Sequence, residues 1–146
     1  MDGIVVGIDG SAESKQALRW AAAEARLRGT TLRVVHAWAF PYFASGLGIE
    51  PVLDAEVIET GRRLAGELVD GELAELGDGA SGIQVERAVV EGAPAPVLIE
   101  AAEGADLLVV GARGRGGFSG LLLGSVSQQC AHHASCPLVI VPPSSH

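Results

Sequence analysis

The chain has few basic residues and few aromatic residues, and each shortage narrows what the protein can bind. Ten Lys and Arg face 18 Asp and Glu, so the formal net charge is −8. This charge disfavours nucleic acid and anionic membranes as partners, because both attract basic surfaces. Aromatic residues make up 4% of the chain, too few for a platform on which bases stack. A bound phosphate must therefore be held locally, by backbone N–H groups and one or two cations.

Cysteines and long apolar runs are scarce as well. Cys130 and Cys136 form no CxxC pair and have no second ligand pair, so we interpret them as reduced thiols packed around a helix end. No apolar run approaches the ~20 residues that cross a bilayer. No signal peptide is visible, since the first apolar run is broken at Asp9. The sequence therefore predicts a cytoplasmic protein with no membrane partner.

Short apolar runs alternate with longer helical patterns along the 146 residues, a length that fits one domain. The apolar runs predict strands at 3–8, 30–37, 83–90, 106–111 and 138–141. The helical patterns predict helices from the cap Ser11 to Arg28, before Gly29, and at 54–76, 94–103 and 125–133. Because strands and helices alternate and the strands are apolar throughout, we predict an α/β fold. Residues 1–146 would form a single domain, a doubly wound five-stranded parallel sheet with helices on both faces.

The helix predicted at 54–76 carries a stripe of residues at helical spacing, which predicts that this face packs in the core. The stripe consists of Ala55, Ile58, Arg62, Ala65, Val69, Leu73 and Leu76. Gly77 and Gly79 follow it, and they predict the end of the helix.

Two loops are candidates for a binding site. In an open α/β sheet, ligands bind beyond the carboxyl ends of the strands, where the strand order reverses. The loop at 7–11 follows the first strand, and the loop at 111–117 follows the fourth. If these strands are neighbours, the two loops face each other across one crevice.

The second loop is rich in glycine, with five glycines between Gly111 and Gly120. Gly124 and Ser125 then open the last helix, whose first N–H groups and dipole favour an anion. Arg113 and Arg115, the two arginines of this loop, concentrate positive charge nearby. This combination predicts a phosphate site. A Walker A loop is excluded because no glycine is followed by Lys-Ser or Lys-Thr, and GxGxxG fails because Ser119 stands where its third glycine should be.

The loop instead matches Gly-x2-Gly-x9-Gly-Ser, with its four defined positions at Gly111, Gly114, Gly124 and Ser125. With this pattern, and with GIDGSAES, VVHAW and the segment 105–142, the chain resembles the universal stress protein family over essentially its whole length. That family has a five-stranded parallel sheet, which implies the strand order 3-2-1-4-5 here. Its ATP-binding branch carries this loop, so the resemblance implies ATP as the ligand, with Mg²⁺ or Mn²⁺ left open.

The resemblance also implies a role for each matching position. Asp9 would accept a hydrogen bond from a ribose hydroxyl or help to place a metal, and the backbone of Ala37 would meet the adenine edge. Gly7 and Ile8 would form the floor of the site, and Val110 and Gly111 would line the ribose side. Arg113 and Gly114 would cover the phosphates, which would be cradled by Gly124, Ser125, Val126 and Ser127.

Structural alternatives stay open at several of these positions. Asp9 could cap the following helix, although Ser11 is the more natural cap and would leave Asp9 free. Gly111 and Gly114 could serve a tight strand-to-helix turn, and Arg113 could be an ordinary solvated charge.

The most favoured function is a nucleotide-binding regulatory protein in which ATP occupancy changes the surface shown to a protein partner of unknown identity. The stress-response role comes wholly from the family resemblance. A slow ATPase or phosphotransferase is one alternative, although Asp9 is the only candidate base and no catalytic residue is assigned. A protein interaction module that uses no nucleotide is another. The strand at 138–141 is predicted at a sheet edge, where family members dimerise, so a homodimer is expected.

Overall fold

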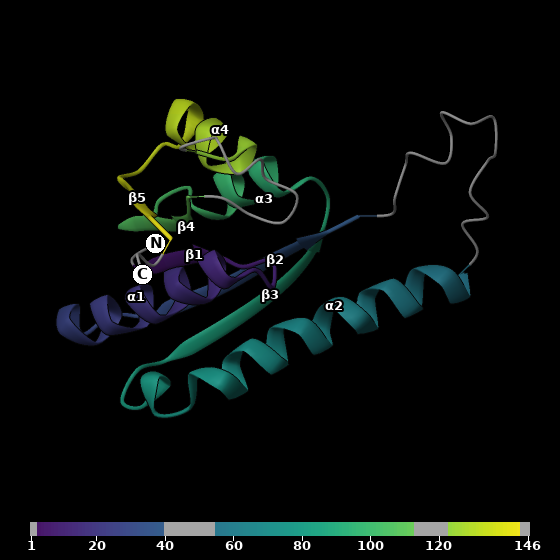
Figure 1. Cartoon of the computed structure of the whole chain (residues 1–146), viewed down its shortest axis with the longest axis horizontal. Helices are drawn as coiled ribbons and strands as arrows, with labels where there is room; N and C mark the ends of the chain where they lie inside the picture. Colours follow the sequence, from purple (N-terminus) through teal and green to yellow (C-terminus); the bar gives the residue numbers. More distant parts are fainter. Residues whose placement is uncertain (1–2, 40–54, 113–122, 144–146) are drawn as a thin grey trace.

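The computed structural model describes residues 3–39, 55–112 and 123–143 (Figure 1). Its five strands form one sheet in the order β3-β2-β1-β4-β5, and every neighbouring pair is parallel. The strands are β1 (Ile4–Gly7), β2 (Leu32–Trp38), β3 (Val85–Glu91), β4 (Leu107–Gly111) and β5 (Leu138–Val141). The helices are α1 (Ala12–Arg28), α2 (Ala55–Leu76), α3 (Pro94–Ala101) and α4 (Ser125–His133), with a short 3₁₀ helix η2 (Gly77–Ala80). The doubly wound fold and the predicted strand order are confirmed.

Helix α1 begins and ends as its sequence predicts. The Ser11 hydroxyl accepts the N–H of Ser14 at 3.2 Å, which supplies an acceptor for one N–H group of the first turn. Gly29 follows the last turn with φ of 65°, a left-handed conformation that glycine adopts without a Cβ clash.

The helices cover both faces of the sheet, with α1 and α2 on one face and α3 and α4 on the other (Figure 1). Alternate residues of β1 point to opposite faces, so Ile4 and Val6 join the core under α1, while Val5 joins the core under α3 and α4. Strands β1 and β4 are apolar on both faces, which is why their sequences read as continuous apolar runs, whereas β2 also carries Arg33 and His36.

Helix α2 packs as predicted over its carboxyl-terminal half, where Val69 lies in the core and Leu73 and Leu76 pack against it, but not over its amino-terminal part. Only Ala65, Val69 and Glu72 are buried on it, whereas Ala55 and Arg62, two members of the predicted stripe, are exposed. Figure 1 shows the amino-terminal part of α2 extending past the ends of β2 and β3. The spacing of apolar residues shows which side of a helix faces the core, but it does not show how far the β-sheet under the helix extends.

The end of α2 at Leu76, directly before Gly77, is confirmed, but the segment after it is not the simple connection to β3 that the sequence suggests. The chain does not simply leave the helix at Gly77, because it continues through η2, and β3 begins only at Val85, two residues later than expected. The guanidinium of Arg26, near the end of α1, donates to backbone carbonyls of this segment, which are those of Asp78, Gly79 and Ser81. Such long-range bonds hold the turn against α1 and have no signature in the local sequence.

Candidate functional site

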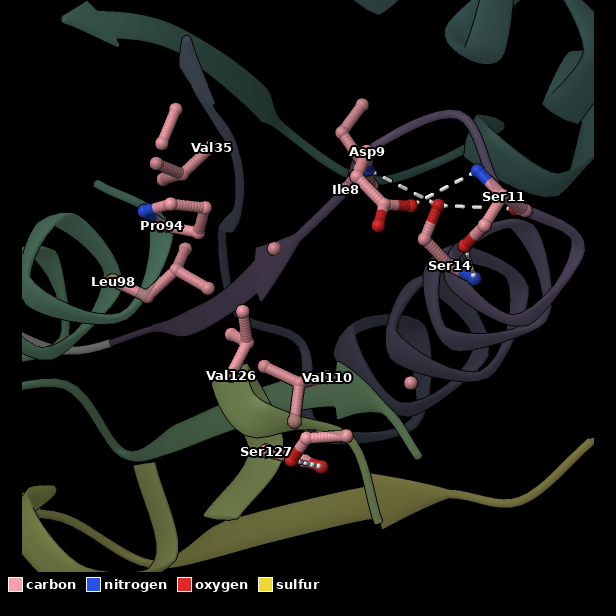
Figure 2. A pocket seen from close by; sticks show the side chains of 14 residues that line it. Ile8, Asp9, Ser11, Ser14, Val35, Pro94, Leu98, Val110, Val126 and Ser127 are labelled. Carbon is pink, nitrogen blue, oxygen red and sulfur yellow. Dashed lines mark hydrogen bonds between the residues drawn. The ribbon is translucent and has the colours of Figure 1, made fainter. Parts of the chain in front are cut away.

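A pocket lies at the carboxyl ends of β1, β2 and β4, between the start of α1 on one side and α3 and α4 on the other (Figure 2). Strand β1 pairs with β2 on one side and β4 on the other, so the strand order reverses at this point. Described residues at the ends of β1 and β4 and at the start of α4 therefore border one pocket, at the place that the sequence predicts for a doubly wound sheet.

Nine of the twelve residues singled out in the sequence line this pocket. They are Gly7, Ile8, Asp9, Ala37, Val110, Gly111, Gly124, Val126 and Ser127. Ser125 is exposed and does not line it. Arg113 and Gly114 lie outside the described residues.

Five lining residues were not singled out in the sequence, and they are Ser11, Ser14, Val35, Pro94 and Leu98. A signal existed for Val35, because it stands two residues before Ala37 on the same strand and so shares its face. No local signal marks Pro94 and Leu98, because a helical pattern does not show which strand ends the helix will overhang. Ser11 belongs to the candidate loop at 7–11, but its sequence pattern assigns it the role of a helix cap and no ligand contact.

The pocket has an apolar side and a polar side. Figure 2 shows Val35, Pro94 and Leu98 on one side and Asp9 on the other, next to Ser11 and Ser14 at the start of α1. Val110 lies between the two sides. This arrangement suits a ligand that joins an apolar ring to a polar or charged group.

The first turn of α4 offers fewer amide donors than the sequence suggested. The Gly124 N–H was expected to face phosphate, but it donates to the Ala112 carbonyl at 2.7 Å. The Ser127 hydroxyl donates to the same carbonyl at 2.8 Å and contacts the Gly124 carbonyl at 3.1 Å. The N–H groups of Ser125, Val126 and Ser127 are the first three of the helix and have no intrahelical acceptor. These three amides are the candidate anion donors.

Asp9 is positioned by the same loop that starts α1. Ser11 caps the helix as predicted, but the expectation that Asp9 is thereby left free is wrong, because Asp9 Oδ1 accepts the N–H of Ser11 at 2.9 Å. A short side chain that bonds the backbone two residues ahead stabilises a tight turn. The turn places the carboxylate at the rim of the pocket (Figure 2).

Two glycines at the pocket are closely packed, Gly7 against the Leu98 side chain and Gly111 against the backbone of Glu13. A Cβ on Gly7 would lie 2.5 Å from Cδ1 of Leu98, and a Cβ on Gly111 would lie 2.9 Å from Cβ of Glu13. The same Gly111 Cβ would stand 3.0 Å from the Glu13 backbone carbonyl. Close approach between β4 and α1 therefore explains Gly111 whether or not a ligand binds.

Within residues 3–39, 55–112 and 123–143, no group of three or more His, Cys, Asp or Glu side chains is placed to hold a metal. In that described part of the chain, none of the helices combines the length and the apolar character that a bilayer crossing requires.

An all-parallel doubly wound sheet with a pocket at its reversal point places the chain among the open α/β proteins of the doubly wound class. Residues 1–142 match the model of the universal stress protein family, and the chain belongs to that family. A universal stress protein of Mycolicibacterium smegmatis is 40% identical over 140 residues, which cover 96% of this chain and 45% of that protein. The chain spans about half the length of the curated relatives it matches.

Solved structures share the fold. The universal stress protein UspA of Lactobacillus plantarum superposes with a TM-score of 0.80 at 21% identity, over 96% of this chain and 97% of that one. A universal stress protein crystallised in complex with cAMP superposes with a TM-score of 0.64 at 30% identity, over 98% of each chain. The family is thus established by sequence and its fold by structure.

Proposed function

We propose that this protein is an ATP-binding regulatory protein whose nucleotide occupies the pocket beyond β1 and β4. The observation that carries the proposal is the two-sided pocket, which sets an apolar wall opposite a carboxylate and beside the first turn of α4. An adenine ring fits the first environment, a ribose the second and a phosphate the third.

Each part of the nucleotide has residues to hold it. The adenine would lie against Val35 and Leu98, with its edge at the backbone of Ala37. Asp9 would accept a hydrogen bond from a ribose hydroxyl, because an ionised carboxylate only accepts.

The phosphates would meet the amides of Ser125, Val126 and Ser127, which begin a helix and carry its positive dipole end. Arg113 and Gly114, outside the described residues, would cover them from the glycine-rich loop. In a chain with a net charge of −8, these local donors must supply the attraction for the phosphates. An accompanying Mg²⁺ or Mn²⁺ would neutralise part of the phosphate charge.

Related structures support an adenine nucleotide. The relative at 30% identity was crystallised with cAMP. Family structures from Archaeoglobus fulgidus and Arabidopsis thaliana hold dAMP and AMP, respectively. The choice of ATP among these ligands rests on the Gly-x2-Gly-x9-Gly-Ser pattern at Gly111, Gly114, Gly124 and Ser125.

The biological setting is part of the same proposal. The protein would act in the cytoplasm in a stress response, and nucleotide occupancy would change the surface that a protein partner meets. It would form a homodimer through β5, which lies at an edge of the sheet, where no other strand of the described residues pairs with its outer side. A monomeric mass in solution at micromolar protein concentration would contradict the homodimer.

The test begins with purified protein. The protein is denatured, any released nucleotide is identified by mass, and the stripped protein is titrated with ATP and Mg²⁺ by calorimetry. We expect stoichiometric ATP binding that Asp9→Ala weakens at least tenfold, since a hydrogen bond to a charged group is worth roughly that factor or more. Leu27→Ala, at an exposed position of α1, is the surface control and should bind like the wild type.

Two other outcomes would redirect the proposal. Absence of ATP binding by folded protein would favour an interaction module that uses no nucleotide. Steady phosphate release that Asp9→Ala abolishes would favour a slow ATPase over a regulatory binder.

A further inference from the structure

The peptide group between Ile8 and Asp9 is held from both sides by buried side chains. It is the first peptide of the chain to leave β1, since the N–H of Ile8 still donates to the Val35 carbonyl at 3.0 Å. On one side, the N–H of Asp9 donates to the Ser14 hydroxyl oxygen at 3.2 Å. On the other side, the Ile8 carbonyl lies 2.8 Å from Nδ1 of His36.

The chemistry of each contact is determined by its partner. A carbonyl oxygen can only accept, so Nδ1 of His36 carries the hydrogen and donates it to Ile8. The Ser14 hydroxyl accepts a hydrogen bond from the N–H of Asp9 and donates one to the Ser11 carbonyl at 3.2 Å. Both polar groups of one peptide therefore have a side-chain partner.

Both clamping side chains are enclosed by the fold. Ser14 is 5% exposed in the first turn of α1, and His36 is 9% exposed on β2. Hydrogen bonds shielded from water hold their geometry more strictly than exposed ones, because breaking them leaves a buried polar group without a partner. Helix α1 and strand β2 thus determine together how the chain leaves β1.

We propose that Ser14 and His36 are positioning residues that orient Asp9 and thereby determine how strongly the pocket discriminates nucleotides by their ribose hydroxyls. This rests on the proposed nucleotide site. The Asp9 carboxylate is anchored to Ser11 through one oxygen, and its backbone is anchored through the clamped peptide. A carboxylate held in one orientation accepts a hydrogen bond best from a ribose hydroxyl at one position. A carboxylate that can rotate bonds a hydroxyl at either position and so discriminates less between nucleotides.

The first measurement needs no nucleotide. Hydrogen exchange followed by NMR on the ligand-free protein should show a protected Asp9 amide, and nitrogen chemical shifts should show the hydrogen of His36 on Nδ1. Ser14→Ala should lower the protection of the Asp9 amide at least tenfold. Val69→Ala, a destabilising change in the core under α2, should leave the Asp9 amide protected relative to the global stability.

The second measurement compares ATP with its 2′-deoxy and 3′-deoxy analogues by calorimetry. The wild type should prefer ATP over at least one analogue by about tenfold, the scale of one hydrogen bond to a carboxylate. Ser14→Ala and His36→Leu should each reduce that ratio at least threefold. His36→Asn, whose amide can donate near the position of Nδ1, should restore most of it, and Val69→Ala should keep the wild-type ratio.

The outcomes separate this proposal from the one it rests on. If ATP does not bind to the wild type, the nucleotide site is wrong, and the exchange data still report on the clamp. If ATP binds and Asp9→Ala abolishes the ratio while Ser14→Ala weakens ATP and its analogues equally, the positioning role is overturned and the nucleotide site stands. An unprotected Asp9 amide in the wild type would also overturn the proposal that Ser14 and His36 hold the Ile8–Asp9 peptide.

Discussion

Replacing Glu72 with Gln should stabilise the protein at neutral pH. Glu72 lies on α2 with 5% of its surface exposed, and its Oε1 is buried without a hydrogen-bond partner among the residues described. Burial raises the pKa of Glu72 above its ordinary value of 4.5. Attraction to Lys15 and Arg19 opposes this rise, and repulsion by Glu75 and Asp9 adds to it.

The sign of the pH dependence follows from the raised pKa. The folded protein holds the Glu72 proton more tightly than the unfolded chain, so the neutral carboxyl contributes stability below pH 4.5. That contribution is lost as the pH rises through the folded-state pKa, where the buried group becomes charged. Gln stays neutral at every pH, so the stability difference between variant and wild type should be smallest in acid and should grow toward neutral pH.

The size of the effect follows from the cost of a buried polar group without a partner, about 1–3 kcal/mol. We expect the lower end, about 1 kcal/mol, because Lys15 and Arg19 offset part of the charge and Gln still buries an amide. For 146 residues, with about 2 cal/mol/K of unfolding entropy each, this corresponds to a Tm increase of about 3 °C.

The assay is thermal and urea unfolding of wild type and Glu72→Gln between pH 4 and 8. Glu75→Gln is the matched control, because Glu75 is 57% exposed on the same helix and pairs with Lys15 at 3.0 Å. An exposed pair contributes little, so this control should change stability by less than about 0.5 kcal/mol. Destabilisation by Glu72→Gln at pH 7, or a stability difference that does not vary with pH, would refute the reasoning.

Three further substitutions follow from packing and backbone geometry. Gly111→Ala should destabilise the fold by about 1–3 kcal/mol, because the new Cβ would meet the Glu13 backbone at 3.0 Å; a wild-type urea midpoint would contradict this. Ser127→Ala should cost about 1 kcal/mol by removing the buried bond to the Ala112 carbonyl, and circular dichroism melts would show it as a lower Tm. Gly29→Ala should cost about 1 kcal/mol, because φ is 65° there, and chemical denaturation that shows no loss would argue against strain at that turn.

Much of the fold was predictable because its signals are local. The apolar runs of β1 and β4 and the caps Ser11 and Gly29 carry their meaning within a few residues. Alternating strands and helices then admit few topologies, since crossovers are right-handed. The predicted sheet follows from these signals together with the family resemblance.

The candidate site was predictable in part. Asp9 and the glycines near α4 stand directly after strand ends, where ligands bind in this class of sheet, so their positions in the chain implied their positions in space. Pro94 and Leu98 were missed because they come from the crossover helix α3, whose placement over the pocket depends on packing with α4 and β2.

The sequence by itself determined the strand and helix types and the neighbourhood of the pocket, because periodicity and capping act over a few residues. The sheet order was expected from the family resemblance. Only the tertiary structure decided which polar groups are already bonded: the Gly124 N–H to Ala112, Asp9 to Ser11, and the Ile8–Asp9 peptide to Ser14 and His36. It also decided that Glu72 is buried. Two of these contacts, Gly124 to Ala112 and Ile8 to His36, join elements that the chain separates, so no local pattern predicts them. The bonds of Asp9 to Ser11 and Ser14 are local, but they depend on how the chain turns after β1.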